Sequence, residues 1–435
     1  MRAEIISVSS NLLNGKTQDQ NIAYLTRRLT HLGIQINQST MVADDKEVLV
    51  KAIEGAEERS DLLIFIGGLG PDENDITKQV ISKFLDVPLV LDKPSEDKII
   101  TYHKNSNFKM PDNNQLQALI LFDSIAIPNA TGLAAGMFYQ NNEKTYILLP
   151  GPYDEMKPTY QETVETLLKE KLLKDRQFET RFLRVFGFSA AELNERLEKF
   201  LSQDEFPIVS FYEMGEEFEI EITTSATNKE EAIKEANQIQ EKIKEHLSSY
   251  VFAEESKTLK ETVRTLLLEN DLTVTAAESL TGGEFLSEFS SLEGASQVLT
   301  GGMVTYSTEV KNEKLGVSKE ITDKYGVVSA QCAIEMAKKA KDMFESNIGV
   351  SLTGVAGPTS LEGEIPGTVW IGLAKDGLEP FAKKFHFAYK RNKNRRLSVS
   401  AALNLIRQVV IKEPIENKVT MDDEELSNKN IEQLE

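Results

Sequence analysis

The most informative part of the sequence reads Leu272-Thr273-Val274-Thr275-Ala276-Ala277-Glu278-Ser279-Leu280-Thr281-Gly282-Gly283. Its β-branched residues predict a strand, and the serine, threonine and glycines that follow predict a tight corner before a helix. Backbone N–H groups of Gly282 and Gly283 would then face a ligand beside Ser279 and Thr281, because glycine has no Cβ to block the approach. The alternative is that Ser279 or Thr281 only caps the helix.

Two further segments suggest chemistry at this corner. Residues 301–307 read as a short strand that is followed by Lys311, and residues 353–358 bring another hydroxyl and two glycines to a strand end. A lysine whose pKa is lowered by burial can serve as the base for a serine nucleophile without any histidine. The alternative is that Lys311 is an ordinary solvated lysine.

Three apolar runs that end in Gly-Pro motifs predict the fold class. The runs cover residues 62–66, 146–149 and 350–352, and none of them alternates with polar residues. Uninterrupted apolar runs are typical of parallel strands that helices cover on both faces. The sequence therefore predicts two α/β units, one in each half, with ligand sites at the carboxyl ends of the strands.

The middle of the chain has a different pattern. Phe218, Ile220 and Ile222 alternate with glutamates, which predicts a strand with one face in water. Helical spacing of apolar residues follows, and Ser189 with Glu192 forms a capping-box pattern before another helix. A small α+β module over residues 177–251 accounts for both features.

Composition and charge exclude several classes of protein. The chain has 435 residues, 40% of them hydrophobic, and 49 basic against 69 acidic side chains give a formal net charge of −20. Its length suggests about three domains. The acidic balance argues against direct nucleic-acid binding and against binding to anionic membranes.

The number of cysteines and the lengths of the apolar runs indicate the cellular compartment of the protein. Cys332 is the only cysteine, so no internal disulfide forms, and no Cys/His spacing fits zinc. No apolar stretch is long enough to span a membrane or to serve as a secretory signal. We therefore expect a cytoplasmic protein. Residues 414–435 carry seven acids against two lysines and predict a disordered tail.

The C-terminal third, residues 258–413, resembles the nicotinamide-nucleotide amidase family, also called PncC or the CinA C-terminal domain. That family hydrolyses the carboxamide of nicotinamide mononucleotide to nicotinate mononucleotide and ammonia, without a cofactor. Residues 359–362 replace a longer glycine-rich run of the family. The residues that carry the resemblance are Ala277-Glu278-Ser279-x-Thr281-Gly282-Gly283, Val304-Thr305-Tyr306-Ser307, Lys311, Gly326-Val327-Val328-Ser329, Thr353-Gly354-x-Ala356-Gly357-Pro358 and Gly367-Thr368-Val369-Trp370.

The resemblance also implies roles for single residues. Ser279 would be the nucleophile and Lys311 its proton-transfer partner, while Tyr306 and Thr353 would orient or stabilise the reacting groups. The residues implied in substrate binding are Thr281, Gly282, Gly283, Ser307, Gly354, Gly357, Arg391 and Arg395.

Residues 1–170 resemble the molybdopterin-binding, MoaB/MogA-like domain of CinA proteins, which implies a three-layer α/β fold. The motifs include Gly67-Gly68-Leu69-Gly70-Pro71, Asp75-x-Thr77-Lys78 and Thr145-Tyr146-Ile147-Leu148-Leu149-Pro150-Gly151-Pro152. In this half the family is linked to metal-assisted hydrolysis of ADP-ribose. The implied nucleotide site comprises Gly67, Gly68, Gly70, Asp75 and Thr77, with Asp75 as the candidate ligand of a divalent metal.

The combination of domains is similar to the CinA family of competence- and damage-inducible proteins. Its middle module is similar to a KH domain, but residues 177–251 lack the Gly-x-x-Gly loop and the basic surface of RNA-binding KH domains. A spacer or a homodimer contact is the expected role.

Three functions follow as hypotheses. The first is hydrolysis of a pyridine mononucleotide by Ser279 and Lys311, and the second is a metal-dependent ADP-ribose pyrophosphatase in the N-terminal domain. The third is a catalytically decayed interaction protein in competence or DNA repair, whose acidic tail binds a basic partner.

Overall fold

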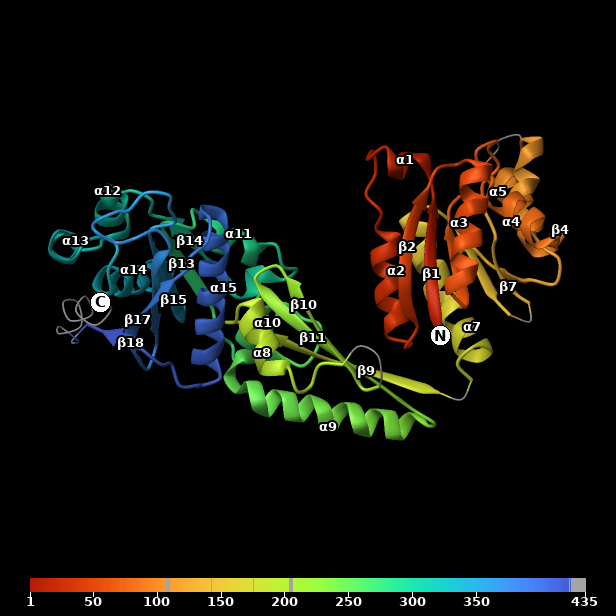
Figure 1. Cartoon of the computed structure of the whole chain (residues 1–435). Helices are drawn as coiled ribbons and strands as arrows, with labels where there is room; N and C mark the ends of the chain where they lie inside the picture. The colour runs from red at the N-terminus through yellow and green to blue at the C-terminus, as the bar shows by residue number, and fades with distance from the viewer. Residues whose placement is uncertain (107–109, 142, 175, 203–205, 422, 424–435) are drawn as a thin grey trace. The chain divides into compact units, whose positions relative to one another are not determined.

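The structure, a computed structural model, describes residues 1–106, 110–141, 143–174, 176–202, 206–421 and 423 (Figure 1). The chain forms two compact units. The first contains Met1–Thr180 and Thr223–Ala236, and the second contains most of the remainder, including Ile208–Ile222 and the described residues from Asn237 onward. Each unit is considered separately.

The first unit is built on a six-stranded sheet with the order β2-β1-β3-β8-β7-β6. Strands β2, β1, β3 and β8 are parallel, whereas β7 and β6 run antiparallel to their neighbours. The expected parallel pairing of the apolar runs near residues 62–66 and 146–149 is confirmed. The bounds are β1 (Arg2–Val8), β2 (Gln35–Val42), β3 (Leu62–Ile66), β6 (Ile125–Ile127), β7 (Gly136–Gln140) and β8 (Thr145–Leu149).

Helices cover both faces of this sheet. Ile6 and Val8 of β1 pack in one core with Leu49 of α3, while Ile5 packs in a second core with Leu25 of α2. This three-layer α/β arrangement is the predicted one. The remaining elements are α1 (Ser10–Leu13), α2 (Asn21–Thr30), α3 (Lys46–Arg59), α4 (Thr77–Leu85), β4 (Leu89–Leu91), α5 (Lys93–Ser106), η1 (Asp112–Ala118), β5 (Leu119–Leu121), α6 (Tyr153–Thr159), η2 (Tyr160–Val164) and α7 (Glu165–Lys171).

The middle module has a four-stranded sheet with the order β10-β11-β9-β12 and two longer helices. Its core includes Leu183, Leu193, Ile220 and Ile243. The capping box of Ser189 and Glu192 is present at the start of α8, as predicted. The bounds are β9 (Gln177–Val185), α8 (Ala190–Leu197), β10 (Ile208–Met214), β11 (Glu217–Ala226), α9 (Lys229–Leu247), η3 (Ser248–Tyr250) and β12 (Val251–Ala253).

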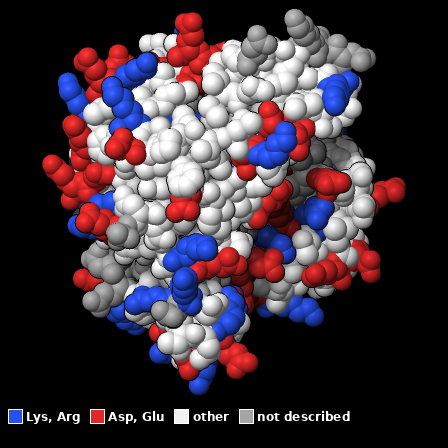
Figure 2. Space-filling view, turned by 90° about the vertical axis from the view of Figure 1, so that its right-hand side faces the viewer, with Lys and Arg blue, Asp and Glu red and all other residues white. Residues whose placement is uncertain are grey.

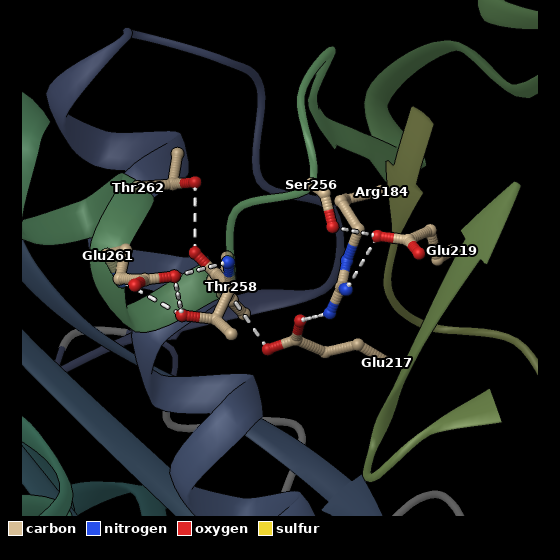
Figure 3. Close-up of polar contacts among 8 residues, drawn as sticks. Arg184, Glu217, Glu219, Ser256, Thr258, Glu261 and Thr262 are labelled. Atoms are coloured by element: carbon tan, nitrogen blue, oxygen red, sulfur yellow. Dashed lines mark hydrogen bonds and ion pairs between the residues drawn. The ribbon is translucent and has the colours of Figure 1, made fainter. Parts of the chain in front are cut away.

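One prediction for β11 is wrong. Its glutamates were expected in water, yet Glu217 and Glu219 are 9% and 1% exposed. Figure 3 shows the reason: the guanidinium of Arg184 lies between their carboxylates and forms ion pairs with both. The Glu217 carboxylate also accepts the N–H of Leu259 at 3.1 Å, at the start of α10. The buried Arg184 on β9 therefore neutralises the carboxylates on the face of β11 that the alternating pattern alone places in water.

The C-terminal domain has a six-stranded mixed sheet with the order β14-β13-β15-β16-β17-β18. Strands β14, β13 and β15 are parallel, and the others add antiparallel. The bounds are α10 (Leu259–Glu269), β13 (Val274–Glu278), α11 (Glu284–Ser290), η4 (Ala295–Gln297), β14 (Leu299–Val304), α12 (Thr308–Val310), η5 (Lys311–Leu315), α13 (Lys319–Tyr325), α14 (Ala330–Met343), β15 (Ile348–Gly354), β16 (Thr368–Lys375), β17 (Leu378–His386), α15 (Arg391–Val410) and β18 (Lys418–Thr420).

The tail prediction needs a correction. Lys418–Thr420 form strand β18, which pairs with Phe381–Lys383 of β17. Backbone pairing at a sheet edge orders this segment despite its polar composition, because edge N–H and C=O groups are available to any extended chain. Residues 422 and 424–435, which belong to the same predicted tail, lie outside the described residues.

The charged side chains on the surface include many Asp and Glu residues, as the acidic composition predicts. On the face shown in Figure 2, Lys and Arg lie among Asp and Glu, and a broad central area carries no charge. The described residues drawn there therefore offer no continuous basic surface of the kind that non-specific nucleic-acid binding requires.

The buried Arg184 cluster leads to a stability prediction. We expect Arg184→Ala to lower the free energy of unfolding of the second unit by about 3–5 kcal/mol, because two buried carboxylates lose their counter-charge. Urea unfolding of the full chain, followed by the fluorescence of Trp370, the single tryptophan, measures this unit.

The control is Lys244→Ala. Lys244 pairs with Glu254 in the same unit, and both side chains are exposed, so we expect a loss below about 1 kcal/mol. Equal losses in the two variants would show that the buried pairs contribute no more than a surface ion pair.

Candidate active site

Ser279 lies at the carboxyl end of β13, an interior strand that lies between β14 and β15. It directly follows Glu278, and its N–H donates to the carbonyl of Leu352 on β15 at 2.8 Å. The residue is 8% exposed. The strand-to-helix corner predicted from the sequence is present, with α11 beginning at Glu284.

Lys311 meets Ser279 from a different segment. Its Nζ donates to Ser279 Oγ at 3.0 Å and to the carbonyl of Thr305 at 2.8 Å. The N–H of Thr305 in turn donates to the carbonyl of Glu278 at 2.7 Å, so the chain after β14 is held beside the end of β13. The structure therefore brings the predicted nucleophile and its predicted base into hydrogen-bond contact.

The surroundings of Lys311 favour its neutral form. The side chain is 1% exposed, and burial lowers the pKa of the amine below its usual value of 10.5. The Cys332 side chain and, to a smaller extent, the negative charge of Glu362 oppose this lowering of the pKa without cancelling it. Among the described residues, no carboxylate lies within ion-pair distance of Lys311 Nζ. An unpaired buried amine is suited to accept a proton from a serine hydroxyl.

Tyr306 and Thr353 contact other groups than the predicted pair. The Tyr306 hydroxyl accepts from Arg391 Nη2 at 3.0 Å, and the Thr353 hydroxyl donates to the carbonyl of Val327 at 2.6 Å. Thr353 directly follows Leu352, the β15 residue that pairs with Glu278. Both residues lie near the site and bond to the segments around it. Tyr306 contacts Arg391, and Thr353 contacts the carbonyl of Val327.

The predicted role of two glycines as oxyanion donors is not met. The N–H of Gly282 donates to the carbonyl of Ser279 at 3.1 Å, and that of Gly283 donates to the Glu278 carboxylate at 3.0 Å. The fully buried Glu278 carboxylate also accepts the N–H groups of Phe285 and Leu286, so it occupies the start of α11 where we expected a ligand. An acidic residue just before a helix N-terminus is the signal that could have indicated this.

Two other backbone donors remain beside the nucleophile. Within the described part of the chain, no acceptor lies within hydrogen-bond distance of the N–H of Leu280 or of Thr281. The Thr281 side chain is fully buried, and its hydroxyl likewise has no described partner. These groups can receive an oxyanion at the turn that carries Ser279.

The N-terminal turn of α15 brings two arginines to the site. Arg391 Nη1 donates to the carbonyl of Gly357 at 2.8 Å, and Arg395 Nη2 donates to the carbonyl of Thr281 at 2.6 Å. Arg395 also lies 3.4 Å from a Glu284 carboxylate oxygen. The structure thus places both arginines that the resemblance implies in substrate binding beside the Ser279 turn and the Gly-Pro loop.

Two of the other predicted binding residues have structural roles. The Ser307 hydroxyl accepts the N–H of Val310 at 3.3 Å and caps α12. A Cβ at Gly354 would lie 2.4 Å from the carbonyl oxygen of Thr368, so close strand packing requires a glycine there. Gly357 has a φ of +99°, which favours glycine, and its carbonyl binds Arg391.

The predicted N-terminal site lies in a pocket of about 830 Å³. Gly67, Gly68, Gly70 and Asp75 line it. Thr77 is fully buried instead, and its hydroxyl donates to the carbonyl of Gly67 at 2.8 Å, so it stabilises the glycine turn.

The charge of this pocket differs from that of a simple phosphate site. Its carboxylates face no lysine or arginine among the described lining residues. The described residues contain no group of three His, Cys, Asp or Glu side chains that could hold one metal ion. Asp75 instead accepts the N–H of Asp72 at 2.9 Å, so the metal prediction receives no support. The acidic residues of the lining are Asp19, Asp44, Asp72, Asp75 and Glu155.

A search for membrane spans agrees with the sequence. Over the described residues, none of the helices combines the length and the apolar character that crossing a membrane requires.

Three family models match the chain consecutively. Residues 4–170 match a probable molybdopterin binding domain, residues 180–253 the damage-inducible protein CinA KH domain, and residues 256–410 the CinA C-terminal domain. A competence-damage inducible protein of Listeria monocytogenes is 41% identical over 406 residues, which cover 93% of this chain and 98% of the relative. The chain belongs to the CinA family.

Other members of the CinA family match all or only part of the chain. A competence-damage inducible protein of Levilactobacillus brevis is 37% identical over 414 residues, covering 95% of this chain and all of the relative. Among solved structures, CinA from Thermoplasma acidophilum is 29% identical and covers 39% of this chain and 96% of that chain, with a TM-score of 0.34.

The bonds of Glu278 lead to a prediction. We expect Glu278→Gln to lower the free energy of unfolding of the second unit by about 1–3 kcal/mol, because the amide NH₂ cannot accept the N–H groups of α11. Urea unfolding followed by Trp370 fluorescence measures the loss. Glu288→Gln, on the exposed side of α11, is the control and should have little effect. A loss no larger than that of the control would contradict the proposed role of the Glu278 carboxylate.

Proposed function

We propose that this CinA-family protein hydrolyses the carboxamide of nicotinamide mononucleotide to nicotinate mononucleotide and ammonia. The observation that carries the proposal is the buried 3.0 Å contact between Lys311 Nζ and Ser279 Oγ. A serine beside a buried amine is a nucleophile with its own base, and such a pair performs acyl transfer without a metal or another cofactor.

The first half of the reaction forms an acyl-enzyme. Neutral Lys311 accepts the hydroxyl proton of Ser279 while Oγ bonds to the carboxamide carbon, which gives a tetrahedral intermediate. The C–N bond then breaks, and the Lys311 ammonium transfers its proton to the leaving nitrogen, which departs as ammonia. The pyridine acyl group remains as an ester on Ser279.

The second half repeats the same proton transfers with water. Lys311 accepts a proton from the attacking water, and the new tetrahedral intermediate collapses with return of the proton to Ser279 Oγ. The products are the pyridine carboxylic acid and free enzyme. In both halves the carbonyl oxygen carries the developing negative charge, and the N–H groups of Leu280 and Thr281 are the donors that we assign to it.

The phosphate of the substrate requires a positive surface beyond the reacting centre. Arg391 and Arg395 supply it, since their guanidinium groups bond mainly to carbonyl and hydroxyl oxygens at the edge of the site. Lys393 and Arg396 of the same helix pair with Glu213 and Glu216 instead. Arg391 bonds to no carboxylate among the described residues, whereas Glu284 neutralises part of the charge of Arg395, so Arg391 carries the larger share of the charge available to a ligand.

The N-terminal pocket supports the second hypothesis less well. An ADP-ribose pyrophosphatase has to bind a dianionic diphosphate, and the described lining provides carboxylates without lysine or arginine. Such a pocket would repel the substrate unless cations bridged the charges. The amidase proposal does not depend on this pocket.

Substitution of the nucleophile tests the proposal. We expect Ser279→Ala to lower kcat for ammonia release from nicotinamide mononucleotide by about four orders of magnitude or more, because the variant loses the hydroxyl that Lys311 Nζ contacts. Enzyme-coupled ammonia detection and chromatography of the mononucleotides measure the two products. Ser290→Ala, on the exposed surface of α11, is the control that should retain activity. Substantial activity of the Ser279→Ala protein would refute the assignment.

The buried amine also predicts a pH dependence. Lys311 must be neutral to accept a proton, so kcat/KM should rise with pH through the pKa of its amine. Burial lowers that pKa, which places the midpoint of the rise below 10.5. Lys311→Arg should be inactive across this range because a guanidinium stays protonated. Activity that is independent of pH, or an active Lys311→Arg variant, would exclude Lys311 as the base.

A further inference from the structure

A carboxylate borders the candidate site on the loop between β15 and β16. Glu362 has a φ of +54°, and its Oε2 accepts the N–H of Val327 at 2.8 Å and that of Val328 at 3.2 Å. No described residue donates a hydrogen bond to its other oxygen, Oε1. The side chain therefore holds the loop to the 327–328 segment with one oxygen and leaves the second oxygen for another partner.

Successive contacts connect this carboxylate to the nucleophile. The carbonyl of Val327 accepts the Thr353 hydroxyl at 2.6 Å, and Thr353 follows Leu352, whose carbonyl accepts the N–H of Ser279 at 2.8 Å. The charge of Glu362 is also close enough to Lys311 to raise the pKa of that amine. Glu362 is an exposed residue that is connected to the Ser279–Lys311 pair through Val327 and Thr353 and that acts on Lys311 through its charge.

Charged groups of both signs surround the site. Arg391 and Arg395 supply positive charge at the start of α15. Of the two other carboxylates near the serine, Glu278 is committed because it binds three N–H groups of the α11 turn. Glu284 lies 3.4 Å from Arg395 Nη2, which neutralises part of its charge, although its Oε2 accepts no hydrogen bond from the described residues. Glu362 is the carboxylate near Lys311 that keeps an oxygen for a ligand. A substrate with a cationic ring and an anionic phosphate matches this arrangement.

We propose that Glu362 is a specificity-determining residue, which favours a cationic N-alkylated pyridinium ring over a neutral ring of the same shape. The inference rests on the proposed amidase function and deepens it. In nicotinamide mononucleotide the ring nitrogen carries a positive charge close to the carboxamide, so a carboxylate beside the site attracts it. A neutral Lys311 does not repel the same ring.

A purely structural role for Glu362 makes a different prediction. If the side chain only fastens the loop to the 327–328 segment, its loss would impair every substrate alike. Glu362→Gln separates the roles, because the amide keeps an oxygen that accepts the two N–H groups and removes only the charge. Glu364→Gln is the matched control, since Glu364 is on the same loop and its carboxylate pairs with Lys384 at 3.0 Å.

The experiment compares two amide substrates on the full chain. One is nicotinamide mononucleotide, and the other is benzamide riboside 5′-phosphate, whose ring is neutral and of the same size. In Glu362→Gln we expect KM for the cationic substrate to rise about tenfold with little change in kcat, while KM for the neutral one stays the same. Glu364→Gln should leave both KM values unchanged.

A second readout follows from the charge on Lys311. Removal of the Glu362 charge should move the midpoint of the pH–rate profile to lower pH, because the carboxylate raises the pKa of the amine. Equal KM increases for both substrates, or no increase for either, would overturn the assignment of Glu362. A wild-type protein that is inert toward both substrates would overturn the proposed function and this inference with it. Wild-type activity with an unchanged substrate preference in the variant would overturn the inference alone.

Discussion

The hydrogen bond between the Lys311 amine and the Ser279 hydroxyl is the interaction on which the proposed chemistry of the C-terminal domain depends. Burying a lysine is unfavourable unless its amine finds acceptors, and here the Thr305 carbonyl and the serine oxygen accept from it. The backbone makes this possible, because Ser279 bonds to β15 and Thr305 bonds to the end of β13. Parallel strands that end at the same edge of the sheet bring the two side chains together.

Other buried charged groups in the second unit also have hydrogen-bond or ion-pair partners. Glu278 is fully buried and accepts three backbone N–H groups, and Arg184 lies between two glutamates of β11. Because these groups are committed, few polar groups near Ser279 remain for a ligand. The described groups that remain include the N–H donors of Leu280 and Thr281, the Thr281 hydroxyl and one oxygen of Glu362, and we propose that they bind a carbonyl oxygen and a cationic ring.

Several elements could be predicted because their signals are local. The β-branched run before Ser279 forms β13, and the capping box at Ser189 begins α8. Other predictions failed because they required knowledge of the neighbouring chain. Alternation in β11 suggested a wet face, but it cannot reveal that Arg184 packs against that face. The polar composition near Lys418 suggested disorder, but it cannot reveal that an edge of β17 is available for pairing.

The sequence by itself determined the domain order, the α/β class and the residue types at the site, because strand pattern, glycine turns and motif spacing are local properties of the chain. The tertiary structure alone decided which groups meet. Ser279 and Lys311 are separated by 32 positions, and Glu362 reaches Val327 across 35, so only strand pairing and loop packing bring them together. The tertiary structure also decided that the Gly283 N–H donates to the Glu278 carboxylate and not to a ligand. The sequence does not show this, because a donor is free only if no acceptor packs against it.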